Sequence, residues 1–259
     1  MERALWSAVT GMRAQEMSLD VISNNLANIN TNGFKDSRVR FQDLLYASLV
    51  IPGAASANGE VDGVQVGHGT RVAGTSRSQT QGALMETGNM LDFAIEGDGF
   101  FEVQLPDGKS AFTRDGAFSM NGAGEVITSD GYRVMGFDTI DPGTTEITVA
   151  HDGSFTAMVN GSSVNKGRIT LARFLNPEAL SAIGRNLFQE TEASGTAETG
   201  LSPGENGVGG LAHRYVERSN VNTATELVNM ITTQRAYEAT SKAIRASDEM
   251  LTTANQLAG

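Results

Sequence analysis

Large apolar residues recur every seven positions near both ends of the chain. The first series comprises Leu5, Met12, Leu19 and Leu26, and the positions three residues after each are Ala8, Gln15, Ile22 and Ile29. Seven of these eight side chains are apolar, which is the pattern of a coiled-coil seam. The pattern predicts a helix over about residues 3 to 31, ended by Asn32-Gly33, because this pair readily adopts the left-handed conformation that stops a helix.

The C-terminal segment carries two such stripes. Thr223 and Glu226 have the spacing of a capping box, which predicts that a helix begins at residue 223. One stripe is apolar and comprises Met230, Tyr237, Ile244 and Leu251, and the other is small and comprises Thr233, Thr240, Ser247 and Ala254. Since a helix hairpin within one chain needs only one seam, two stripes predict neighbours on more than one side.

Between about residues 91 and 192 the pattern changes to short alternating runs separated by Asp-Gly and Asn-Gly pairs, which predicts antiparallel hairpins. Asn176-Pro177-Glu178 predicts one short helical turn inside this region. The expected fold class is therefore α+β, with paired terminal helices in a coiled-coil-like layer around a central antiparallel β domain. The expected divisions are a helical polymerisation core at 1–46 and 212–259, extended β arms at 47–90 and 193–211, and a β body at 91–192.

Charge follows the same division. Each end, 1–46 and 212–259, holds five cationic and five anionic residues, so the whole formal charge of −11 lies in the middle of the chain. Neutral ends suit dense packing, and an acidic middle suits a surface that faces water. This charge excludes a nucleic-acid binder, which needs clustered Lys and Arg. The longest apolar runs are too short to span a membrane, and a cleavable secretion signal is not expected. The absence of cysteine excludes disulfide bonds.

Candidate catalytic, cofactor and metal sites are not supported by the spacing of titratable residues. Six Asp-Gly pairs begin at Asp62, Asp98, Asp107, Asp115, Asp130 and Asp152, and they are too far apart for a calcium loop but suit turns. Glu96-Gly97-Asp98-Gly99 lacks the Lys and the helix of a phosphate-binding loop. His68, His151 and His213 lack partners at metal-binding spacing. We therefore expect a non-enzymatic protein without cofactor or metal.

Three blocks of sequence resemble the bacterial flagellar basal-body rod and hook family. The N-terminal block includes Asn24, Asn25, Leu26, Ala27, Asn28, Thr31, Gly33 and Phe34. The C-terminal block includes Ser219, Asn220, Val221, Gln234, Arg235, Ala236, Tyr237 and Glu238, and a third block begins at Asp92-Phe93-Ala94-Ile95. The three blocks occur in order over the whole chain. Within the family, the length and the stretch Phe41 to Tyr46 resemble the distal rod more than the larger hook proteins.

The resemblance implies a subunit of a straight, stiff tube that transmits torque for motility and surrounds the export channel. Its expected partners are further copies of itself, neighbouring rod and hook proteins, the basal-body rings and the flagellar secretion apparatus. It is expected in the basal body across the periplasm, exported by the type III apparatus without a cleavable signal. The expected polymerisation interface comprises Leu5, Met12, Leu19, Ile22, Leu26, Ile29, Met230, Tyr237, Ile244 and Leu251.

Three alternatives remain open from the sequence. A proximal rod or short hook-type protein of the same family would differ in the segment 47–75, which we expect to brace neighbouring subunits. A secreted β-rich enzyme with helical ends would need a pocket with converging titratable groups. An adhesin with a trimeric stalk would show a longer heptad series and discrete oligomers instead of open filaments.

Overall fold

The computed structural model describes residues 2–48, 65–141, 143–159 and 161–258. The chain divides into two compact units. The first contains Met1–Leu26, Ser37–Ser76 and Thr223–Gly259, and the second contains Ala27–Asp36 and Arg77–Asn222. The domain boundaries expected from the sequence stay a prediction. Most of the segment 47–75 and the pair Asp62-Gly63 lie outside the described residues.

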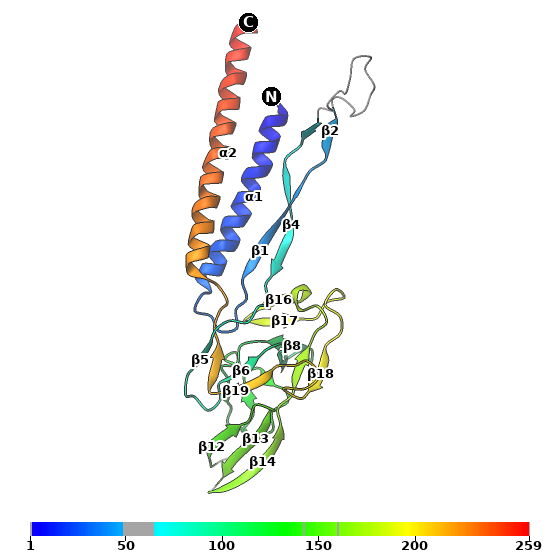
Figure 1. Ribbon diagram of the computed structural model, residues 1–259, viewed down its shortest axis with the longest axis vertical. Helices are drawn as coiled ribbons and strands as arrows, with labels where there is room; N and C mark the ends of the chain where they lie inside the picture. The colour runs from blue at the N-terminus through cyan, green and yellow to red at the C-terminus, as the bar shows by residue number, and fades with distance from the viewer. Residues whose placement is uncertain (1, 49–64, 142, 160, 259) are drawn as a thin grey trace. The chain divides into compact units, whose positions relative to one another are not determined.

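The first unit pairs the two terminal helices. Helix α1 (Glu2–Ala27) has 26 residues and α2 (Thr223–Ala258) has 36, and the two lie side by side (Figure 1). Strand β1 (Ser37–Asp43) pairs with β4 (Thr70–Arg77), and β2 (Tyr46–Ser48) pairs with β3 (Gln65–Gly67). The turn before β4 meets α1 at Gly69, whose φ of +100° and closeness to Thr10 leave no room for a side chain.

The predicted start of the C-terminal helix is confirmed, because α2 begins at Thr223 with Glu226 in its first turn. The predicted end of the N-terminal helix is wrong, because α1 ends at Ala27. The backbone N–H and the hydroxyl of Thr31 donate to the backbone and side-chain oxygens of Asn28, at 3.2 and 3.1 Å. These local bonds form a turn that competes with the helix, so Ile29 lies beyond α1.

The second unit is built on antiparallel strands, which confirms the expected central β domain (Figure 1). Its largest sheet has seven strands in the order β16-β17-β8-β7-β11-β10-β9. In chain order these strands are β7 (Phe101–Gln104), β8 (Ser110–Thr113), β9 (Ser119–Met120), β10 (Val126–Ile127), β11 (Arg133–Val134), β16 (Ser181–Gly184) and β17 (Leu187–Gln189).

Smaller sheets complete the unit. A three-stranded sheet contains β12 (Thr144–Val149), β13 (Ser154–Val159) and β14 (Ser162–Arg168). The two-stranded pairs are β15 (Leu171–Arg173) with β18 (Glu198–Leu201), β19 (Gly210–His213) with β6 (Phe93–Glu96), and β20 (Tyr215–Glu217) with β5 (Leu84–Glu86). The short helical turn is confirmed at Pro177–Ala179.

Several predicted turns form hairpins between paired strands. Asp107-Gly108, Asn121-Gly122, Asp130-Gly131 and Asp152-Gly153 do so. Asp115-Gly116 does not, because it connects β8 to β9, which belong to different hairpins. A Cβ at Gly116 would lie 1.6 Å from the carbonyl oxygen of Phe93. This glycine is required by the close approach of two backbones, which a local turn signal does not reveal.

The main core of the second unit is rich in phenylalanine. Phe93, Phe101, Phe118, Phe137 and Phe155 are all buried in one cluster. Most of their ring pairs meet edge to face or tilted, with the rings of Phe101 and Phe118 at 5.1 Å and 85°. Such pairs add about 0.5–1.5 kcal/mol each beyond the burial of their area. The β unit therefore has a core of its own.

Candidate functional site

Small and polar side chains form the contact between α1 and α2. On α2 the most buried positions, Glu226, Thr233 and Ser247, recur at heptad spacing and are 6%, 8% and 9% exposed. A Cβ added to Gly11 of α1 would lie 3.7 Å from the methyl group of Thr240. The small stripe predicted on the C-terminal helix is therefore the face that packs within the chain, since small residues let helix backbones approach closely.

The large apolar residues of the expected polymerisation interface lie beside this contact. Ile22 is 7% exposed and is the buried member among the ten. Tyr237 is exposed, and the other members, Leu5, Met12, Leu19, Leu26, Ile29, Met230, Ile244 and Leu251, are half-buried. The structure therefore does not bring these residues together into a closed core within one copy. Part of each apolar stripe therefore stays exposed and is available for contact with another molecule.

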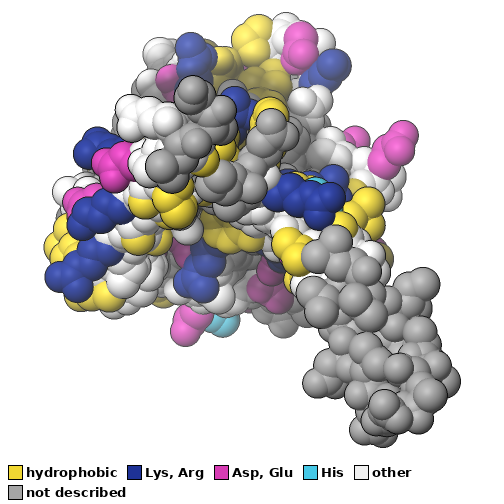
Figure 2. All heavy atoms as spheres, turned by 90° about the horizontal axis from the view of Figure 1, so that it is seen from above, with side chains coloured by type: hydrophobic (Ala, Val, Ile, Leu, Met, Phe, Trp, Pro, Cys, Tyr) yellow, Lys and Arg dark blue, Asp and Glu magenta, His cyan; other side chains and the backbone are white. Residues whose placement is uncertain are grey.

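Further large apolar side chains are exposed on the two helices. They are Trp6 and Met17 on α1, and Leu227, Val228, Ile231 and Met250 on α2. Figure 2 shows hydrophobic side chains at the surface seen along the helices, interspersed with charged ones. The heptad positions alone do not identify these residues. Met250 directly precedes the stripe residue Leu251 and could be read from the sequence as flanking it, whereas Trp6, which directly follows Leu5, was missed.

Asn25 joins three elements of the first unit. Its side chain is 1% exposed. Its amide nitrogen donates to the carbonyl of Ser37 at 2.9 Å, and its amide oxygen accepts from the N–H of Ser37 at 3.0 Å. The same nitrogen lies 3.5 Å from Oε2 of Glu226 in the first turn of α2. An asparagine offers both a donor and acceptor, which a leucine or an aspartate cannot replace.

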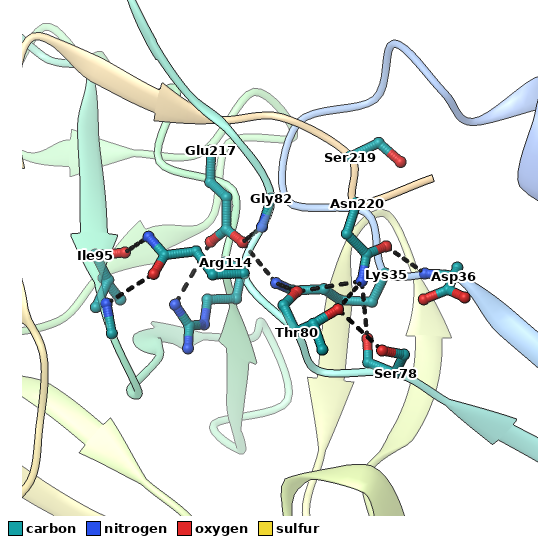
Figure 3. A network of polar contacts seen from close by, with 12 residues as sticks. Lys35, Asp36, Ser78, Thr80, Gly82, Ile95, Arg114, Glu217, Ser219 and Asn220 are labelled. Atoms are coloured by element: carbon teal, nitrogen blue, oxygen red, sulfur yellow. Dashed lines mark hydrogen bonds and ion pairs between the residues drawn. The ribbon is translucent and has the colours of Figure 1, made fainter. Parts of the chain in front are cut away.

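Within the second unit, Glu217, two residues before the C-terminal motif, contacts the end of the N-terminal motif and the residues just after it (Figure 3). The carbonyl of Glu217 accepts from the N–H of Gly33 at 2.8 Å. Its carboxylate Oε1 lies 2.5 Å from Nζ of Lys35 and accepts from the N–H of Gly82 at 2.8 Å. Oε2 lies 3.5 Å from the guanidinium of Arg114. One carboxylate thus holds two cations from distant parts of the chain.

Burial sets the electrostatics of this group, which we call the Glu217 cluster: Glu217, Lys35 and Arg114. The side chains of Lys35 and Glu217 are fully buried, and that of Arg114 is 4% exposed. Burial lowers the pKa of Lys35 and of Arg114, because it disfavours the charged form, while the carboxylate of Glu217 opposes this shift in both. The cluster therefore depends on its single anion.

Asn220 makes a second link between the two motifs (Figure 3). Its amide oxygen accepts from the N–H of Asp36 at 2.7 Å, and its amide nitrogen donates to the carbonyls of Ser78 and Thr80 at 3.2 and 3.1 Å. The hydroxyl of Ser219 accepts from the N–H of Val221 at 3.3 Å. These motif residues tie chain segments together.

The remaining motif residues lie at the surface of the helices or in the turn after α1. Asn24, Ala27, Gln234, Arg235 and Glu238 are exposed, while Leu26, Asn28, Thr31, Phe34 and Ala236 are half-buried. The five exposed side chains do not belong to a hydrophobic core within the described part of the chain. Its position suits contacts with other molecules.

Gly33 should tolerate a side chain poorly. Its φ is +66°, and a Cβ there would lie 2.6 Å from the backbone nitrogen of Asp115. We expect Gly33→Ala to lower the free energy of unfolding of the second unit by more than the roughly 1–2 kcal/mol of the left-handed conformation alone. Gly88→Ala is the matched control, because Gly88 has a φ of +73° in open space. Equal losses in denaturant unfolding would show that the contact at Gly33 is unimportant.

The described part of the chain holds no group of three or more His, Asp or Glu residues arranged to bind a metal. Within these same ranges, no helix is both long and apolar enough to cross a bilayer.

His213 stacks on Phe93, with ring centres 5.4 Å apart, and one ring nitrogen lies 3.0 Å from the carbonyl oxygen of Met90. Partial burial lowers the pKa of His213, because it disfavours the charged form of the ring.

Three family descriptions match successive parts of the chain. "Flagella basal body rod protein" matches residues 5–35, "Flagellar hook protein FlgE/F/G D1 domain" matches residues 94–157, and "Flagellar basal body rod FlgEFG protein C-terminal" matches residues 212–257. The first and third matches cover the helices and motifs described above. The second covers the middle of the β unit.

Individual proteins are similar over nearly the whole chain. The flagellar basal-body rod protein FlgG of Buchnera aphidicola (subspecies Baizongia pistaciae) is 46% identical over 96% of both chains. FlgG of Borreliella burgdorferi is 45% identical over 99% of both. The flagellar hook protein FlgE of Helicobacter mustelae is 34% identical over 90% of this chain but only 53% of its own length. Full-length similarity therefore favours the rod proteins over this hook protein.

Proposed function

Because this chain belongs to the flagellar basal-body rod and hook family, a family of structural proteins and not of enzymes, we propose that it is a subunit of the distal rod. In this role, copies of the chain assemble into a straight, stiff tube that transmits torque and surrounds the export channel. Its neighbours along the flagellum are other rod and hook proteins. The surrounding rings and the secretion apparatus that delivers the subunits complete the proposed set of partners.

The observation that carries this proposal is the division of faces on the terminal helices. On α2 the most buried side chains are small or polar, and on both helices the large apolar residues of the stripes other than Ile22 stay partly exposed. Exposed apolar surface of this kind marks an interaction site. Copies that pack side by side would cover Leu19 and Leu26 of α1 and Ile244 and Leu251 of α2. We therefore assign the polymerisation interface to the ten residues named above except Ile22, which is buried within one copy.

The opposite face of α2 suits the wall of an export channel. Arg235, Glu238, Lys242, Arg245 and Glu249 are exposed on the helix. Three of these residues are cationic and two are anionic, and each anion lies three or four positions from a cation, so that neighbouring opposite charges on the helix compensate one another. A wall of mixed charge would not bind unfolded apolar or strongly charged chains tightly as they pass. The acidic β unit would face outward, towards the rings.

A rod position is favoured over the hook by length. The FlgG relatives match this chain from end to end, whereas the hook protein is nearly twice as long as the region that matches. The bracing role of residues 47–75 remains a proposal from the sequence. A proximal rod or short hook-type position is the second candidate.

Immunogold labelling of isolated basal bodies distinguishes these positions. Antibodies raised against the β unit should label the part of the rod nearest the hook, and cells that lack the chain should build basal bodies without this part. Label on the hook itself, or on the end of the rod nearest the inner membrane, would contradict the distal assignment. A basal body of normal length without the chain would do the same.

A further inference from the structure

Trp6 is the most exposed aromatic side chain that the structure describes. It lies in the second turn of α1 and is 69% exposed, and it is the one tryptophan in the sequence. Burying a tryptophan removes a large apolar area from water, and its indole N–H then needs a hydrogen-bond acceptor. A tryptophan left in water near the end of a helix therefore indicates a contact that one copy does not complete.

A groove of about 350 Å³ lies in the same unit, near the other end of α1. Ile22 and Val21 of α1, Val39 of β1, and Glu226, Asn229 and Thr233 of α2 contribute to its lining. A dry cavity of about 150 Å³ can hold benzene, and an indole is about half as large again as benzene. The groove is therefore large enough for the side chain of Trp6 from another molecule.

The chemistry of the groove also fits an indole. The valine and isoleucine side chains offer apolar contact to the ring. The carboxylate of Glu226 and the side chains of Asn229 and Thr233 offer oxygen atoms that can accept the indole N–H. A purely apolar groove would leave that N–H without a partner. Arg38 also lines the groove, and a guanidinium can stack on the face of an aromatic ring.

We propose that Trp6 of one copy occupies the groove between α1, β1 and α2 of the next copy. Trp6 and Ile22 are sixteen positions apart on one helix, which corresponds to about 24 Å along its axis. Trp6 cannot therefore reach the groove of its own α1. A protruding side chain at one end and a matching groove at the other form a head-to-tail contact, which generates open filaments instead of closed pairs.

This inference rests on the proposed function, because it requires copies of the chain to polymerise. Intrinsic fluorescence separates the two, since Trp6 is the sole tryptophan. The purified full chain is assembled by concentration in sulfate, which strengthens apolar burial, and polymer is counted by sedimentation and electron microscopy. We expect the tryptophan emission to move to shorter wavelength as polymer forms. Polymer with the emission of the monomer would overturn the inference and leave the proposed function standing, whereas a chain that forms no polymer would overturn both.

Variants at position 6 test the contribution of the ring. We expect Trp6→Ala to raise the lowest concentration at which polymer forms by at least about tenfold and Trp6→Phe to raise it less. Because the side chain is exposed, both variants should unfold like the parent chain. Parent-like polymerisation of Trp6→Ala would contradict the proposal.

Cysteine pairs test the location, because the native chain has no cysteine. One preparation carries Trp6→Cys and the other carries Thr232→Cys at the groove. After the two are assembled together, a short thiol-specific crosslinker should join the two variants to each other. The matched control replaces Thr232→Cys by Ser129→Cys, an exposed position of the β unit. Crosslinking that is equal in the two mixtures, or absent from both, would contradict the assignment of the groove.

Discussion

Ile244→Asp is expected to abolish polymerisation while both units of the chain stay folded. Ile244 is half-buried on the apolar stripe of α2, beside the small stripe that contacts α1. A carboxylate there can still reach water in a single copy. In a polymer the same carboxylate would be covered by a neighbouring helix without a partner, which is costly. A loss of about 3 kcal/mol at each contact would weaken association more than a hundredfold, and the loss would recur in every subunit.

Sedimentation over a series of protein concentrations measures this effect, and circular dichroism checks the fold. Ile183→Asp is the matched control, because Ile183 is 44% exposed on the β unit. We expect this control to polymerise at nearly the parent concentration. Normal polymers from Ile244→Asp would show that the apolar stripe of α2 does not contact other copies.

Glu217→Gln should cause the largest loss of stability among single changes in the second unit. The change removes the anion of the Glu217 cluster, so Lys35 and Arg114 would remain buried with like charge and no carboxylate between them. Removing one partner of a buried ion pair costs about 3–5 kcal/mol. For a unit of this size, that loss corresponds to a fall in melting temperature of roughly 6–20 °C.

Glu146→Gln is the control for the same chemical change in an exposed pair. Glu146 lies 3.2 Å from Arg214, and their side chains are 52% and 40% exposed. An exposed pair contributes at most about 1 kcal/mol. Calorimetry on both variants should therefore show a much larger loss for Glu217→Gln. Equal losses would mean that the buried cluster does not stabilise the unit.

Local patterns in the sequence were sufficient to predict the helices, the hairpins and the fold class. The start of α2 at Thr223 follows from its capping residues, and Asp107-Gly108 forms the expected hairpin. The early end of α1 was missed because side-chain bonds in the turn at Asn28 and Thr31 compete with the heptad pattern. The role of Gly116 was missed because its close neighbour, Phe93, is distant in sequence.

The candidate site was predicted only in part. The heptads identified both stripes of α2, but they could not say which one contacts α1, because both satisfy the same spacing. Asn25 and Asn220 were recognised as motif residues without a physical role. The Glu217 cluster joins residues that lie 182 and 103 positions apart. Periodicity describes neighbours along one element and carries no information on such contacts.

Electron microscopy of the concentrated, purified full chain shows whether its copies polymerise into a rod. We expect straight, open-ended tubes whose length increases with protein concentration, and we expect none in preparations of Ile244→Asp. Discrete closed oligomers, or a chain that remains monomeric at every concentration under conditions that favour apolar burial, would contradict this expectation.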